Sequence, residues 1–224
     1  MKVVMILLGM MALGSENSFG FGNGRSSASP SVPAPTPSAT PVATVPSPPN
    51  SDIGTGGLRV VIQQSSNFNS SELVHLEQSR TALEKAVNSE EFKQKVLHFT
   101  YQGQETFVQN NGLTNLQIYN KIMEGAEQTP QPTAANNTMD LFVSLYTSSF
   151  FGRNVIGYTD PSVPTIFMNT YFYDSATPAG TAGNMMHEWM HKLGFDHDYN
   201  STARRPSSVP YAIGYIAEDL AAKY

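Results

Sequence analysis

The chain contains no cysteine. This absence excludes a lipoprotein anchor, a disulfide framework and any thiolate ligand for a metal ion. Positive charge is also sparse, because 13 lysine and arginine residues against 18 aspartate and glutamate residues give a net charge of -5, and no run of five basic residues occurs. Proteins that bind DNA or RNA usually present a basic patch to the phosphates, so we expect no nucleic-acid partner.

Long apolar runs are confined to the N-terminus, which reads MKVVMILLGMMALGS. One lysine, an apolar run from Val3 to Leu13 and then small residues are typical of a secretory signal peptide, which we place at residues 1–20. Cleavage within Ala12-Leu13-Gly14 or at Gly20 fits the pattern, and an uncleaved anchor or a buried helix is the alternative. The run is short for a bilayer span, and no later segment is typical of a transmembrane helix. We therefore expect a secreted protein, periplasmic or extracellular.

Residues 21–57 form a segment of low complexity that contains SSASPSVPAPTPSATPVATVPSPPNSD. Proline at this density favours extended backbone and opposes helix and sheet, so we expect a disordered linker. A ligand for a proline-binding domain is the alternative interpretation. Residues 58–224 remain for one globular domain, which we expect to be a monomer.

Apolar spacing and turn residues predict an α+β fold for this domain. A β-branched run predicts a strand at 58–64, and the capping-box spacing of Asn69 and Glu72 predicts a helix after it. Two further helices are expected, one reaching His98 and one at 114–128. Strand candidates follow at 139–146, 153–159 and 164–172, and the segment ATPAGTAG then leads into a last, apolar helix. This order favours a mixed β-sheet packed with helices.

The last predicted helix carries the motif HEWMHKLGFDHD at residues 187–198. Residues four apart lie one above the other on a helix, so His187 and His191 can bind one ion from consecutive turns. Glu188 projects beside them and can reach a water molecule on that ion. The neighbouring methionines and Trp189 make the helix apolar almost all round, which predicts that it is buried. Two buried imidazoles need a partner to offset their lost hydration.

A third ligand is expected just beyond the helix. Gly194 can adopt the left-handed conformation that ends a helix and turns the chain, so that His197 returns to the same ion. Asp198 is the alternative third ligand, or else it braces the turn through hydrogen bonds. Three imidazoles leave one tetrahedral position for water, which favours a catalytic zinc ion. His75 and His98 lie alone in predicted helices. We expect each to be a surface residue or to have its own hydrogen-bond partner, and not to bind a metal.

The segment HEWMHKLGFDH resembles the metzincin signature H-E-x-x-H-x-x-G-x-x-H at every fixed position. The resemblance implies a zinc endopeptidase of zincin fold, with a twisted mixed sheet before the active-site helix and a small C-terminal subdomain after it. It implies one zinc ion on His187, His191 and His197, with Glu188 as general base. It also implies that substrate pairs with an edge strand before the helix, for which we nominate residues 164–172. An ordinary interior strand is the alternative for this segment.

One metzincin element departs from the pattern. The family places a methionine in a tight turn beneath the zinc, and no methionine follows Met190 in this chain. The segment SSVPYAIG at 207–214 is similar to that turn, with Val209 where the methionine would lie. Tyr211 then takes the place of a tyrosine that binds zinc or stabilises the oxyanion in some members.

The implied activity is hydrolysis of peptide bonds in a protein or peptide substrate by zinc-activated water. Two alternatives remain open. The same chemistry could act on a non-protein amide, such as a peptide in cell-wall material, or the chain could be a zinc-containing binding module without turnover. The presence of Glu188 argues against the last one, because an inactive site does not need a general base.

Overall fold

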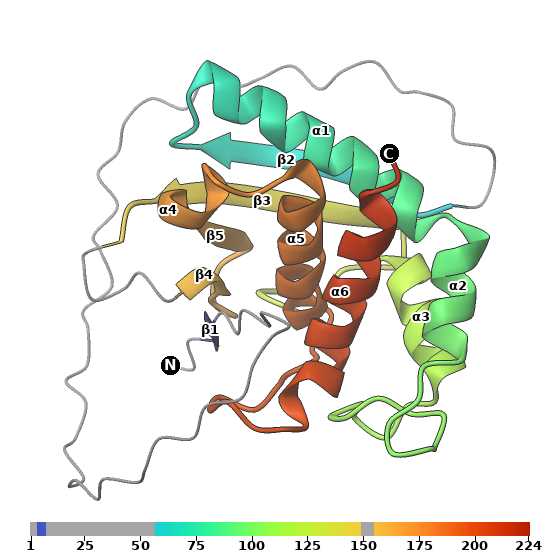
Figure 1. Cartoon of the computed structure of the whole chain (residues 1–224). Coiled ribbons are helices and arrows are strands. Elements are labelled where there is room, and N and C mark those ends of the chain that lie inside the picture. The colour runs from blue at the N-terminus through green and yellow to red at the C-terminus, as the bar shows by residue number, and fades with distance from the viewer. Residues whose placement is uncertain (1–3, 8–56, 149–154) are drawn as a thin grey trace, which may run out of the picture.

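The computed structural model describes Val4–Leu7 and residues 57–148 and 155–224 (Figure 1). The expected signal peptide and linker lie outside the described residues, except for Val4–Leu7 and Gly57. Among the described residues, no helix has the length and apolar character that a membrane crossing needs. The described chain is a mixed α+β structure, as its sequence predicts.

The elements follow one another in the order strand, helices, strands, helices. They are β1 (Val4–Leu7), β2 (Arg59–Ser66), α1 (Ser70–Val87), α2 (Glu90–Leu97), α3 (Asn115–Glu124), β3 (Thr138–Tyr146), β4 (Val155–Thr159), β5 (Thr165–Asn169), α4 (Thr170–Tyr173), α5 (Pro178–Lys192), the 3-10 helix η2 (Arg205–Ser207) and α6 (Val209–Ala221).

The sheet has the strand order β1-β4-β5-β3-β2. β2, β3 and β5 run parallel, whereas β4 is antiparallel to β5 and β1 is antiparallel to β4. The nomination of residues 164–172 as the edge strand is therefore wrong. β5 bonds to β3 on one side and to β4 on the other, so it has no free backbone edge. The strand also stops at Asn169, whose side chain caps α4, so 170–172 are helical.

Helix boundaries follow local capping signals. Asn69 accepts from the backbone of Glu72 and the Glu72 carboxylate accepts from the backbone of Asn69, which is the predicted capping box of α1. α3 ends at Gly125, whose φ of 64° is left-handed, so this helix is shorter than the predicted 114–128. α5 begins with Thr177 as cap and Pro178 as its first residue, so most of ATPAGTAG belongs to the helix instead of leading into it.

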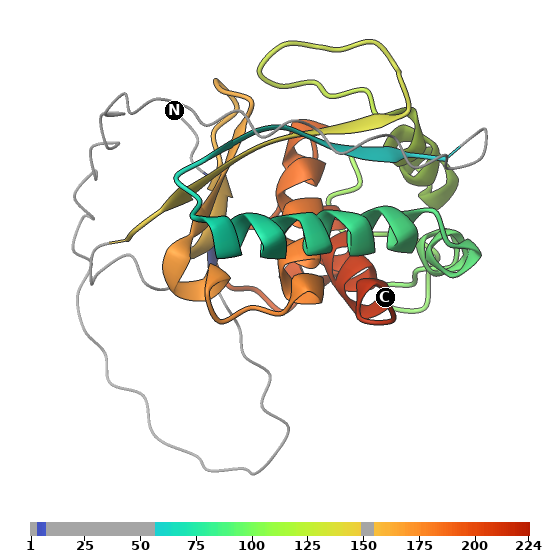
Figure 2. The same cartoon turned by 90° about the horizontal axis from the view of Figure 1, so that it is seen from above.

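The helices α1, α5 and α6 lie on the same side of β2 and β3 (Figure 2). Buried residues from the sheet, from these three helices and from α2 and α3 form one hydrophobic cluster. α5 and α6 approach most closely where glycines face each other, since a Cβ atom on Gly183 would stand 2.7 Å from the Glu218 Cβ and one on Gly214 would stand 3.1 Å from the Gly183 carbonyl oxygen. This close packing brings the start of α6 against the histidines of α5.

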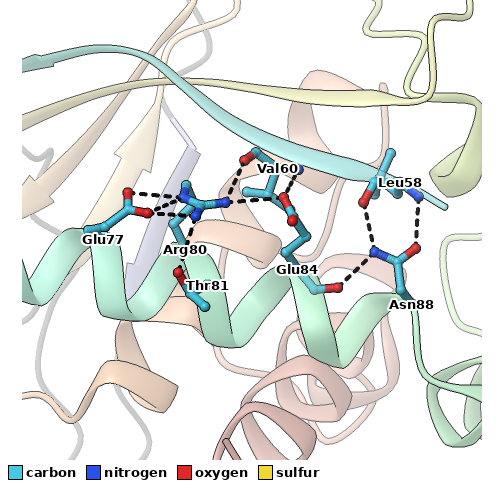
Figure 3. Close-up of polar contacts among 7 residues, drawn as sticks. All are labelled: Leu58, Val60, Glu77, Arg80, Thr81, Glu84 and Asn88. Carbon is cyan, nitrogen blue, oxygen red and sulfur yellow. Dashed lines mark hydrogen bonds and ion pairs between the residues drawn. The ribbon is translucent and has the colours of Figure 1, made fainter. Parts of the chain in front are cut away.

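Side chains of α1 cover the outer edge of β2 (Figure 3). The Val60 N–H donates to the Glu84 carboxylate over 2.8 Å, and Arg80 donates to the Val60 carbonyl over 3.1 Å. Asn88 accepts from the Leu58 N–H and donates to the Leu58 carbonyl, both over 2.8 Å. These side chains make the hydrogen bonds that a neighbouring strand would make to Leu58 and Val60, so another strand cannot pair with the first part of this edge.

Candidate metal centre

The candidate site is built on the buried half of α5. His187 and His191 are 5% and 7% exposed, and Glu188 is completely buried. Every residue from Met185 to Lys192 is buried, which confirms the predicted burial of this helix. The helix therefore presents two imidazoles and one carboxylate in a region from which water is largely excluded.

The chain turns sharply after α5, as predicted. Gly194 has a φ of 87°, and its N–H donates to the His191 carbonyl over 3.0 Å. A Cβ atom at this position would stand 2.4 Å from Oε1 of Gln128, so both the conformation and the space favour glycine. The turn brings His197, which is 8% exposed, back to the two histidines of the helix.

The three histidines meet as the sequence predicts. One ring nitrogen of each lies within 4.8 Å of those of the other two. His191 Nδ1 lies 2.7 Å from the Phe195 carbonyl oxygen and His197 Nδ1 lies 3.1 Å from the Asp198 carbonyl oxygen. His187 hydrogen-bonds the Pro210 backbone. A proton held on that side of each ring leaves the Nε2 lone pair free to bind a metal.

Four buried polar atoms at this site have no hydrogen-bond partner in the described part of the chain. They are Nε2 of His187, His191 and His197 and Oε1 of Glu188. Leaving a buried polar atom unpartnered typically costs about 1–3 kcal/mol, so four together favour a site that binds a further group. A metal ion fits this set of atoms, because three neutral nitrogen ligands suit zinc. Other late transition metals also bind such ligands, with affinities that follow their usual order.

Burial keeps the imidazoles neutral. It lowers the pKa of His191 to about 3, with the nearby His197 ring as a second cause. It also lowers the pKa of His187 well below its ordinary value and that of His197 in the same direction. The neutral form is the one that binds a metal, so the ligands need no deprotonation at neutral pH.

The Glu188 carboxylate is held by a neighbouring strand. Its Oε2 accepts a 2.7 Å hydrogen bond from the Thr159 hydroxyl at the end of β4. A Cβ atom on Gly157 in the same strand would stand 3.3 Å from Oε1, so the glycine leaves space beside this oxygen. Burial raises the pKa of Glu188 to about 8, and the bond from Thr159 and the charge of Lys192 act in the opposite direction.

Tyr211 lies against two of the three clustered histidines. Its ring centroid is 4.4 Å from that of His187 and 4.8 Å from that of His197. Its hydroxyl accepts a hydrogen bond from the buried Arg205, whose guanidinium also lies 4.7 Å from the ring centroid. Burial raises the pKa of Tyr211 to about 12, so the phenol carries its proton at neutral pH. Val209 is completely buried at the first residue of α6, in the segment compared with the methionine turn.

Asp198 is engaged away from the histidine nitrogens. Its carboxylate accepts from Arg204 over 2.7 and 2.8 Å and from the Thr202 hydroxyl over 2.6 Å. These bonds lower the pKa of Asp198 to about 2. The residue therefore braces the loop between His197 and η2, one of the two roles considered for it.

Lys192 is a buried cation that holds the β4–β5 connection against α5. Its Nζ donates to the carbonyls of Val163 and Asp160 over 2.5 and 3.1 Å. Burial lowers the pKa of Lys192 to about 8. A lysine next to a histidine in an apolar helix is a sequence signal for such a contact, whereas no sequence signal indicates the contacts of Thr159 and Arg205.

The remaining histidines do not join the cluster. His75 Nε2 lies 2.9 Å from the Thr181 hydroxyl, and His98 Nδ1 lies 3.0 Å from the Glu105 carboxylate. Each has a polar partner, as lone helical histidines usually do. Comparison of the chain with protein-family models, curated proteins and solved structures finds no match.

Proposed function

We propose that the chain is an exported, metzincin-like zinc endopeptidase that hydrolyses peptide bonds in protein or peptide substrates. The observation that carries the proposal is the convergence of three free histidine nitrogens and one free carboxylate oxygen in a buried site. A structural zinc site would use four protein ligands, whereas three histidines leave one position for water. The carboxylate beside them is the group that such a water needs as its base.

Zinc held by the three histidines would supply the Lewis acidity that activates water and polarises the scissile carbonyl. Beside such a cation the pKa of Glu188 would fall from about 8, so that the ionised carboxylate accepts the proton from the attacking water and delivers it to the leaving amine. The hydrogen bond from Thr159 fixes the carboxylate for this transfer. Tyr211, protonated and oriented by Arg205, donates a hydrogen bond to the developing oxyanion.

The arrangement of the sheet supports an extended substrate. β4 is antiparallel to the three parallel strands and carries Thr159, so a peptide paired along its outer edge would pass the catalytic carboxylate. In the full chain β1 pairs with this edge. Removal of residues 1–20 as a signal peptide would leave the edge open, which agrees with activity after export.

Metal analysis and cleavage assays test the proposal together. The protein and its Glu188→Ala variant are expressed from the full chain, and zinc content and cleavage of a broad peptide library are measured. We expect one zinc ion in both and cleavage only by the unmutated protein. Glu105→Ala is a matched control, since that exposed carboxylate pairs only with His98 in the described structure.

The other outcomes separate the rival functions. One zinc in both proteins with cleavage by neither would favour a non-protein amide substrate, or a binding module if cell-wall material is also left intact. Absence of zinc from both would overturn the metal centre. Equal cleavage by both proteins would overturn the role of Glu188.

A further inference from the structure

An open cavity of about 410 Å³ lies beside the metal centre, between α5, α6 and the segment around α4. His187 and Tyr211 line it, and both belong to the candidate metal centre. A peptide whose scissile bond lies at the metal would therefore place a neighbouring side chain in this cavity. The residues of the cavity wall then decide which side chains are accepted.

The cavity holds one unpartnered carboxylate. Glu218 lines it from α6, and among the described residues it has no hydrogen-bond or ion-pair partner. The next residue, Asp219, differs because it pairs with Lys95 over 3.0 Å. Of the described residues that line the cavity, Glu218 is the only carboxylate, and no lysine or arginine is among them.

Two glycines of α5 make room for this carboxylate. Its oxygens lie 3.8 and 3.2 Å from the points where Cβ atoms of Gly180 and Gly183 would stand. Both positions lie in the first turns of α5, where the helix dipole stabilises a negative charge. Glu218 therefore places a carboxylate on one wall of the cavity.

The other walls suit an apolar stem. Ile156 of β4, Phe172 of α4 and the half-exposed Tyr215 of α6 line the cavity. A long side chain with methylene groups and a cationic end can lie along such a surface and place its charge on a carboxylate. The tyrosine ring adds a favourable face for a cation.

We propose that this cavity is the specificity pocket of the enzyme and that Glu218 selects a lysine or arginine next to the scissile bond. The inference rests on the proposed function, because it assigns a substrate class to the same site. An acidic side chain is disfavoured by repulsion from Glu218, and a small one leaves the apolar walls uncovered.

Binding and cleavage are measured separately on the zinc-loaded protein, which is expressed from the full chain and purified after export has removed residues 1–20. The binding probes are short peptide hydroxamates, which chelate zinc, with lysine, its uncharged analogue norleucine, or glutamate beside the hydroxamate. Affinities are determined by titration calorimetry, and cleavage is measured with a quenched peptide library varied on both sides of the scissile bond. The variants are Glu218→Gln and Glu218→Lys, with Asp219→Asn as the control that loses the same charge one residue away.

We expect lysine to bind roughly fivefold more tightly than norleucine, the upper range for a solvent-accessible ion pair. The ratio persists in Asp219→Asn, falls to about one in Glu218→Gln and reverses towards glutamate in Glu218→Lys. Equal binding of lysine and norleucine, or a ratio unchanged in Glu218→Gln, overturns the proposal. A fall of the lysine to norleucine affinity ratio in Asp219→Asn that equals the fall in Glu218→Gln also overturns the proposal.

The two readouts distinguish the inference from the function on which it rests. Cleavage without a preference for basic residues would support the peptidase function and contradict the assignment of the cavity as its specificity pocket. Preferential binding of the lysine probe without any cleavage keeps the pocket and rejects the peptidase. Neither binding nor cleavage by the zinc-loaded protein rejects both.

Discussion

Replacing Thr159 by valine removes the hydroxyl that holds the Glu188 carboxylate, while the shape of the side chain is almost unchanged. Thr159 is 1% exposed and its hydroxyl donates to Glu188 over 2.7 Å. The other carboxylate oxygen has no partner within the described structure. The substitution therefore leaves the general base without any hydrogen bond from the described protein.

The size of the effect follows from the strength of one buried hydrogen bond to a charged group. Such a bond is worth about 1.5–3 kcal/mol, and about 1.4 kcal/mol corresponds to a factor of ten in rate. We expect kcat/KM of Thr159→Val to fall between about 10- and 150-fold. The loss should appear mainly in kcat, because the hydroxyl is directed at the base and does not line the substrate cavity.

Steady-state kinetics on a cleaved peptide, with zinc content and thermal unfolding measured in parallel, test this expectation. Thr159→Ser keeps the hydroxyl and should remain within about threefold of the unmutated rate. Thr165→Val is a control for loss of a threonine hydroxyl from the neighbouring strand β5. Full activity of a folded, zinc-loaded Thr159→Val protein would refute the role given to this hydrogen bond.

Three further predictions concern the oxyanion, the substrate pocket and the sheet edge. Tyr211→Phe should keep one zinc ion and lose at least about tenfold in kcat, because a donor to the oxyanion is removed; unchanged kcat would leave Tyr211 a packing residue. The preference for lysine requires ionised Glu218, whose pKa burial and Asp219 raise above its ordinary value. The lysine to norleucine ratio, followed by calorimetry from pH 8 to 4, should therefore fall with a midpoint above 4.5, and a constant ratio would contradict this. Glu84→Ala should reduce the free energy of unfolding in urea by about 2–4 kcal/mol, since the buried Val60 N–H and Arg80 lose a partner. The control is Glu77→Ala, which removes the more exposed ion-pair partner of Arg80 and should reduce the free energy of unfolding by less than about 1 kcal/mol.

Local signals in the sequence predict the histidine cluster that the structure shows. The spacing of His187, His191 and His197 and the glycine at 194 determine a helix, its end and a turn, and all of these depend on neighbouring residues. The capping box at Asn69 is local in the same way. Two further local signals mark helix ends. Glycine ends α3, and the Thr177–Pro178 pair begins α5.

Other features could not be read from the chain because they depend on contacts between distant segments. The apolar run at 164–172 gives no information about strand order, and in the structure β5 lies between β3 and β4. Thr159 meets Glu188 across 29 residues. Glu218 shares a cavity with His187 only because facing glycines let α5 and α6 pack closely.

The side chains of Arg80, Glu84 and Asn88 along β2 also restrict how copies of this protein can associate. Growth of a β-fibre by addition of one sheet to the next requires two pairing edges on every molecule. Here the first part of one edge, at Leu58 and Val60, is already bonded to groups from the same chain. Copies that lose β1 could join through β4 into pairs, and each pair would then present only β2 edges, on which less backbone is free to extend an aggregate.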